Sequence, residues 1–194
     1  EKPNSILLRQ EQLRVDGVSR EAYRLEVRKN HNIVISGSDP AGVFYGIQSL
    51  MAILPVGAFL GSADDIRLEA MTIEDAPRFH YRGIHMDVER NFQTKETVLK
   101  ALDLMAFYKI NTFHFNLTED EAWRLEIPSL PELAQVGGQR EHPPIRFSGP
   151  VSLKDHAVVH PAYGSGPFAY AEGSNGSGYY TRDEFIEILQ YATA

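Results

Sequence analysis

Two strand-like segments near the middle of the chain alternate apolar and polar side chains. Residues 83–88 (GIHMDV) place His85 and Asp87 on the face opposite three apolar side chains, since successive strand side chains point to opposite faces. Residues 111–118 (NTFHFNLT) repeat this pattern, with His114 on the polar face. Strands of parallel sheets are covered on both faces and usually read as apolar runs. The polar second face therefore predicts an interior lined for ligand chemistry.

A helix is predicted between these strands, over residues 94–109. Its apolar side chains recur at helical spacing, and Thr94 suits the cap at its start. A strand, a helix and a second strand in succession form the right-handed crossover unit of α/β folds. In barrels built from such units the chemistry lies at the carboxyl ends of the strands. Here those ends are residues 87–92 and 117–124.

The preceding part of the chain reads as a small separate domain, residues 1–76. Apolar runs in residues 5–37, broken by turn residues, predict a strand meander. A helix then begins at Asp39 or Pro40 and ends near Leu54, followed by a last strand. We therefore expect a small α+β domain, with a β-sheet backed by one helix.

The remaining residues, 77–194, contain the two strands, the helix and a long loop at about 141–178 that is rich in Gly and Pro. Loops of this length without secondary structure are usually functional or mobile. Its position after the second strand would place it over the face that carries the chemistry.

Three motifs carry a resemblance to a known family: PRFHYRGIHMDVERNF, LDLMAFYKINTFHFNLTEDEAWRLEI and PSLPELAQVGGQR. Together they resemble the start of the catalytic barrel of family-20 glycoside hydrolases, the β-N-acetylhexosaminidases and chitobiases. GYYTRDEFIEILQYA is similar to the next barrel helix, and residues before Pro77 are similar to the small domain that precedes that barrel. The resemblance implies an α/β fold, in which a small α+β domain precedes the first two β/α units of a TIM-type barrel. The barrel is incomplete here, because eight strands take about 250 residues.

The resemblance implies an enzyme that releases terminal β-linked N-acetylglucosamine or N-acetylgalactosamine by substrate-assisted retention. Its substrates would be N-acetylhexosamine-terminated glycans or chitooligosaccharides, and its location periplasmic, cell-surface or secreted. The family's acid is a glutamate that follows an aspartate after the fourth barrel strand, and no motif here matches that pair. We therefore expect an amino-terminal piece of a longer enzyme, inactive by itself. The alternative is a non-catalytic carbohydrate-binding or interaction module derived from the family.

Arg90 is the principal candidate for substrate binding. In the family, the arginine of this DVxR motif hydrogen-bonds the hydroxyls of the sugar at the cleavage point, and a guanidinium offers several donors in one plane. The alternative is a surface salt bridge to Glu89 or Asp87. Glu119 occupies the position of a family aspartate that supports a histidine from a later loop, so it is a possible supporting carboxylate.

Asp87, His114 and Asp120 are expected to support the barrel interior. His85 and His114, with Asp87 and Glu119, could suggest a metal site, but no His-x-x-x-His or Glu-x-x-His spacing is present, so no metal and no cofactor are expected. Trp123 could stack on a sugar, although a packing role is favoured.

Two further charged groups read as structural. The TRDE string at Thr181 matches a helix capping box, which removes Asp183 and Glu184 as candidates for the acid pair. Arg82 precedes its strand and is expected at the end of the barrel away from the chemistry.

The composition argues against several classes of binding partner and of site. The formal net charge of −7 disfavours nucleic acid, whose binding surfaces are basic. No apolar run approaches the ~20 residues of a membrane span. The absence of cysteine excludes disulfides and thiolate metal sites. Open strand edges in an incomplete barrel predict either self-association through this part of the chain or local disorder there.

Overall fold

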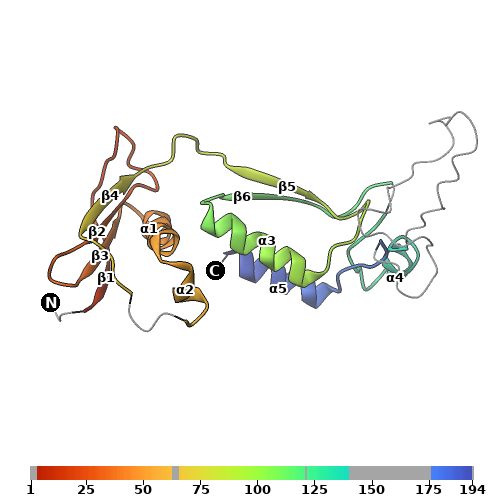
Figure 1. The fold of residues 1–194 in the computed structure, drawn as a ribbon. Coiled ribbons are helices and arrows are strands. Elements are labelled where there is room, and N and C mark those ends of the chain that lie inside the picture. Colours follow the sequence, from red (N-terminus) through yellow and green to blue (C-terminus); the bar gives the residue numbers. More distant parts are fainter. Residues whose placement is uncertain (1–3, 63–65, 121, 140–175, 194) are drawn as a thin grey trace, which may run out of the picture. The chain divides into compact units, whose positions relative to one another are not determined.

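The structure is a computed structural model with a mixed α/β fold that divides into two compact units (Figure 1). It describes residues 4–62, 66–120, 122–139 and 176–193. The first unit comprises residues 1–82 with 104–112, and the second comprises 83–103 with 113–194. Most of the predicted loop at 141–178 lies outside the described residues.

A four-stranded sheet forms the first unit, in the order β1-β3-β2-β4. Its strands are β1 (Ile6–Gln10), β2 (Tyr23–Val27), β3 (Ile33–Gly37) and β4 (Met71–Asp75). β1 pairs in parallel with β3, whereas β2 is antiparallel to both β3 and β4.

The predicted strand meander is therefore wrong in its first connection, because β1 lies beside β3 and not beside β2. The connection over residues 11–22 is too long for a hairpin loop of 2–5 residues. It turns back on itself where the backbone N–H groups and carbonyls of Val15 and Val18 pair at 2.9 and 2.8 Å. β3 then offers the free edge that β1 occupies.

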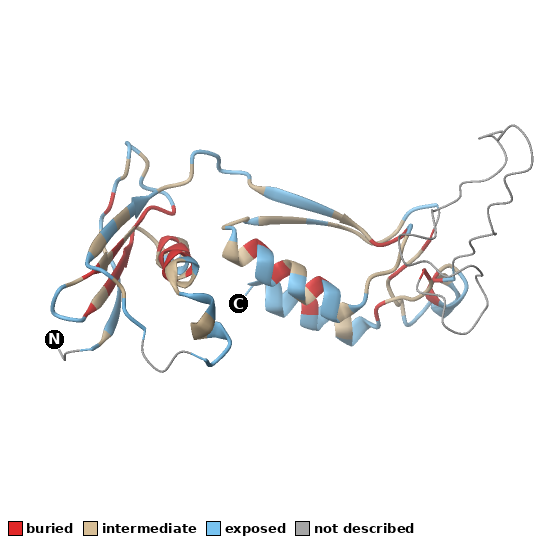
Figure 2. Ribbon diagram, in the orientation of Figure 1, coloured by how far each residue is buried: buried red, intermediate tan, exposed pale blue. Residues whose placement is uncertain are grey.

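The helix α1 (Pro40–Ile53) covers one face of this sheet, as predicted, and a short helix α2 (Val56–Phe59) follows. Leu25, Ile35 and Leu50 form the buried centre between α1 and the sheet. Helix and sheet approach closely at Gly46, where an added Cβ would lie 2.4 Å from the side chain of Ile35. Figure 2 shows the buried residues of this unit concentrated in β2, β3 and α1.

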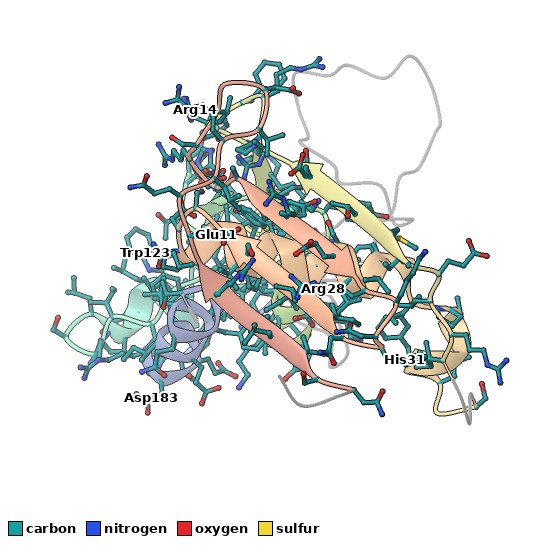
Figure 3. The ribbon with its side chains drawn as sticks, turned by 90° about the vertical axis from the view of Figure 1, so that its left-hand side faces the viewer. Glu11, Arg14, Arg28, His31, Trp123 and Asp183 are labelled. Carbon is teal, nitrogen blue, oxygen red and sulfur yellow. The ribbon has the colours of Figure 1, made fainter. Side chains whose placement is uncertain are left out.

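The opposite face of the sheet is polar, because the side chains of β2 alternate between buried and partly exposed. Ion pairs cross this face: Arg24 to Glu74 at 2.6 Å and to Glu11 at 3.8 Å, and Arg28 to Glu26 at 2.9 Å. Glu11 and Arg28 are labelled on the sheet in Figure 3.

A strand–helix–strand segment continues the chain, formed by β5 (Gly83–Asp87), α3 (Lys95–Phe107) and β6 (Thr112–Asn116), as the sequence predicts. β5 and β6 form a two-stranded sheet. In the second unit, α4 (Pro131–Gln135) and α5 (Arg182–Thr193) follow.

Helices α3 and α5 lie side by side in the second unit (Figure 1). Lys95 pairs with Glu187 at 2.6 Å, and the Tyr191 hydroxyl donates to Asp103 at 2.5 Å. Val98, Leu102 and Ile188 supply buried apolar side chains from the two helices.

The capping box that begins α5 is confirmed. The Glu184 N–H donates to the Thr181 hydroxyl at 3.2 Å, and the Thr181 N–H donates to the Glu184 carboxylate at 2.9 Å. Asp183, in the first turn, is labelled in Figure 3. In the described part of the chain, no helix has both the length and the apolar character needed to cross a membrane.

Candidate sugar-binding site

The candidate site lies where β5 and β6 end, within the second unit. The Val88 N–H donates to the Asn116 carbonyl at 3.2 Å, which aligns the two strand ends. The segment after β5 carries Glu89 and Arg90, and the segment after β6 carries Glu119. Residues far apart in the sequence therefore meet at one edge of the sheet.

The guanidinium of Arg90 joins three carboxylates. Its Nη1 contacts Asp87 and lies 2.9 Å from Glu89 Oε1, while its Nη2 lies 3.5 Å from Glu119 Oε2. The Arg90 side chain remains 46% exposed. The salt-bridge alternative thus describes the contacts of Arg90 in this structure, and Glu119 is an additional partner that this alternative did not include.

Asp87 anchors the first turn after β5. Its Oδ1 accepts from the backbone N–H groups of Glu89 at 3.0 Å and Arg90 at 3.3 Å. Burial acts to raise the pKa of Asp87, but hydrogen bonds from Arg90 outweigh it and lower the pKa below its ordinary value. Asp87 is therefore ionised at neutral pH.

Glu89 has a different environment, because its side chain is 0% exposed. Among the described residues, neither of its carboxylate oxygens has a hydrogen-bond donor. Burial, followed by the neighbouring carboxylates of Glu119 and Asp87, raises its pKa to about 7. The sequence pattern treated Glu89 only as a possible partner of Arg90 and missed its burial.

Arg124 organises the backbone beneath this cluster and was not anticipated. Within the described part of the chain, its buried guanidinium donates to five carbonyl oxygens, at 2.5 to 2.9 Å. These belong to Val88, Glu89, Gly138, Gly176 and Gly178. Two of these carbonyls belong to the turn that carries Glu89 and Arg90, so Arg124 fixes the backbone of that turn. Nothing in the string AWRLEI distinguishes a buried arginine from an exposed one.

The other predicted support residues lie nearby on the strands and loops. His85 and His114 are exposed and stack edge to face, with ring centroids 4.6 Å apart. Asp120 is also exposed. The described residues contain no group of three or more side chains that could hold a metal ion. Asn116 donates to Glu119 at 3.1 Å.

Trp123 and Arg82 both make local contacts. Trp123, labelled in Figure 3, is partly buried, and its ring N–H donates to the Leu125 carbonyl at 2.6 Å. Arg82, in the first unit, pairs with buried Glu21 at 2.6 Å and donates to the Lys109 carbonyl at 2.7 Å.

Two family descriptions match the sequence. Residues 79–194 match "Glycosyl hydrolase family 20, catalytic domain", and residues 1–76 match "Glycosyl hydrolase family 20, domain 2". The chain belongs to glycosyl hydrolase family 20. Together the two matches cover nearly all of the sequence.

Curated relatives in family 20 share substantial sequence identity with the chain. A β-hexosaminidase from Vibrio vulnificus is 48% identical over 174 residues, which are 89% of this chain and 18% of that protein. An N,N'-diacetylchitobiase from Vibrio harveyi is 41% identical over 173 residues, which are 89% of this chain and 17% of that protein. The chain thus spans less than a fifth of the length of these two relatives.

Solved structures of family-20 enzymes resemble the chain in fold. A Vibrio harveyi exo-β-N-acetylglucosaminidase in complex with N-acetylglucosamine gives a TM-score of 0.67 at 28% identity, over 97% of this chain and 25% of that one. A mutant Streptomyces plicatus β-hexosaminidase in complex with its product, GlcNAc, gives a TM-score of 0.69 at 31% identity. The match covers 97% of this chain and 31% of that one.

Proposed function

We propose that this chain forms part of a β-N-acetylhexosaminidase that acts on N-acetylhexosamine-terminated glycans or chitooligosaccharides. Membership of family 20 supports this proposal, as do the names of relatives that are β-hexosaminidases and a diacetylchitobiase. A hexosaminidase structure with bound GlcNAc supports the class of sugar.

The proposed architecture has a small α+β domain over residues 1–76 and the first two β/α units of a barrel within 77–194. The boundaries of the two family matches support this division, because one ends at residue 76 and the other begins at residue 79. The succession β5, α3, β6 and α5 supports the assignment of two β/α units. In such barrels the strand ends that carry Arg90 form the face where substrates bind.

Arg90 is the proposed sugar-binding residue, and its geometry is the observation that carries the proposal. Contacts with Asp87, Glu89 and Glu119 fix the plane of the guanidinium at the ends of β5 and β6, while nearly half of the side chain stays exposed. A planar donor group fixed in this way is suited to binding neighbouring hydroxyl oxygens of one sugar ring.

In the proposed reaction, this chain contributes binding and not proton transfer. Family resemblance implies attack by the substrate's own 2-acetamido oxygen on the anomeric carbon, with a separate Asp-Glu pair that orients the amide and protonates the leaving oxygen. Arg90 would hold the ring from its far edge while these steps occur, and Glu119 would act as a supporting carboxylate.

Replacement of Arg90 by Ala in the full-length enzyme tests the proposal. We expect kcat/KM for an aryl N-acetyl-β-glucosaminide to fall by roughly 30- to 1000-fold, because about 2–4 kcal/mol of hydrogen bonding to the transition state is lost. Arg90→Lys should not restore activity, since an ammonium cannot reproduce the planar fork.

A matched control is Arg14→Ala, because Arg14 is an exposed arginine in the first unit (Figure 3). This variant should keep wild-type kinetics. Wild-type kcat/KM in Arg90→Ala would refute the sugar-binding role. Sugar binding without turnover by the full-length wild type would instead support a non-catalytic carbohydrate-binding module.

A further inference from the structure

Glu89 is a buried acid whose charged form would receive too few hydrogen bonds from its surroundings. Its carboxylate is fully buried, and neither oxygen accepts a hydrogen bond from the described residues, although Arg90 Nη1 lies 2.9 Å from Oε1. A buried carboxylate without donors is costly. Protonation removes this cost, because the protonated group is neutral and has a donor of its own.

The charged groups around Glu89 come from three segments. Asp87 ends β5, Arg90 follows in the same turn, and Glu119 follows β6. Arg124 donates to the backbone carbonyl of Glu89. Three carboxylates thus share the Arg90 guanidinium, and this excess of negative charge favours uptake of one proton.

Glu119 is the acceptor for that proton. It contacts the same guanidinium as Glu89, through Nη2 where Glu89 uses Nη1, so the two carboxyl groups lie side by side. Asp87 is less suited to this role, because its Oδ1 already accepts from two backbone N–H groups and its Oδ2 contacts the Arg90 guanidinium. Two adjacent carboxylates repel one another, whereas a carboxylic acid beside a carboxylate forms a hydrogen bond.

We propose that Glu89 and Glu119 share one proton, and that this proton positions Arg90 for sugar binding. While the proton is present, Glu89 donates to Glu119, and the guanidinium is oriented chiefly by Asp87. When the proton leaves, Glu89 and Glu119 are both anions that draw the guanidinium into the cluster and compete with sugar hydroxyls for its donors. Glu89 is therefore a positioning residue, and its action on substrate rests on the proposed function.

The pH range of this effect follows from the environment of Glu89. Its pKa, raised to about 7 by burial and then by the adjacent carboxylates, leaves the proton largely in place below neutral pH. Sugar binding should therefore weaken as the pH rises through 7. A structural role for Glu89 alone would not produce this dependence.

The test measures kcat and KM from pH 5.5 to 8.5 in the full-length enzyme. The wild-type KM should rise by up to about tenfold across this range, because a group with a pKa of about 7 loses its proton there. In Glu89→Gln the amide mimics the protonated acid and donates to Glu119. Its KM should stay near the low-pH wild-type value throughout.

Glu132→Gln is the control, because Glu132 is an exposed glutamate in α4. It should keep the wild-type rise in KM. A KM that rises equally in wild type and Glu89→Gln would overturn the proposal.

A second measurement distinguishes failure of this proposal from failure of the proposed function, since it needs no activity. Glu89 binds its proton more tightly in the folded state, with a pKa of about 7, than in the unfolded state, with a pKa near 4.5. The free energy of unfolding of the wild type, relative to Glu89→Gln, should therefore fall between pH 4.5 and 7 and then level off. A difference that is independent of pH would refute the shared proton even if no sugar is hydrolysed.

Discussion

At the scale of single residues, the second unit uses buried charge in two ways. The guanidinium of Arg124 is fully buried, yet its five hydrogen bonds to carbonyl oxygens compensate for its lost hydration. Glu89 is equally buried, but its oxygens accept no hydrogen bond from the described residues and its contact with Arg90 is an ion pair, which makes its charge the more adjustable of the two. Arg124 therefore fixes the backbone, whereas Glu89 changes its charge with pH.

Replacement of Arg124 by Lys should destabilise the second unit by roughly 3–5 kcal/mol, because a single ammonium cannot reach all five carbonyls and leaves several unpaired. Urea denaturation of the full-length protein would measure this as a lower midpoint for this unit. Arg182→Lys, at an exposed arginine in α5, should change the midpoint little. Equal midpoints for the two variants would contradict the role of Arg124.

Strand alternation and crossover topology placed Asp87 and Arg90 at one strand end and Glu119 at the next, but the contact between Arg90 and Glu119 was not predicted. They did not reveal Arg124 or Glu89. The burial of these two side chains depends on segments that arrive from elsewhere in the chain. A charged residue in a polar string looks the same whether water or backbone surrounds it.

At the scale of elements, local signals were sufficient where the cause is local. α1 begins at its Asp-Pro signal, and α5 begins at its capping box. The partner of β1 was predicted wrongly, because pairing depends on which edge is open once β2 and β3 have paired. Alternation of side chains contains no information about that choice.

Asp39→Ala should lower the free energy of unfolding of the first unit by about 1–2 kcal/mol. Asp39 caps α1 by accepting from the Gly42 N–H at 2.7 Å, and its other oxygen accepts from the Glu21 N–H at 2.8 Å. Asp39→Asn keeps one acceptor oxygen and should recover part of the loss. Hydrogen exchange should show faster opening of the first turn of α1 in the Ala variant, and unchanged protection there would contradict the cap.

At the scale of the whole molecule, the two-stranded sheet of β5 and β6 is the part with unpaired strand edges. Among the described residues, β5 and β6 pair only with one another, so each keeps an open edge. Ile84 on β5 is exposed, as are Phe79 and Tyr81 just before it. Such edges and apolar groups favour pairing with another chain.

We predict that the isolated chain self-associates through β5 and β6 and does not hydrolyse an aryl N-acetyl-β-glucosaminide. Light scattering over a dilution series should show a concentration-dependent mass, which Ile84→Lys should reduce, because a charge on an edge strand opposes pairing. The activity assay should stay at background. A monodisperse wild-type monomer would contradict the first half of this prediction, and turnover within a hundredfold of the full-length enzyme the second.

The hydrogen bonds of Arg124 also constrain the order of folding. Two of its acceptors, Gly176 and Gly178, lie 52 and 54 residues further along the chain. Closing a loop of that length costs entropy before any bond is gained. During synthesis, the turn that carries Arg90 therefore cannot reach its final form until the ribosome has added those later residues. We infer that the edge that carries Arg90 matures late, well after the small sheet at the start of the chain has formed.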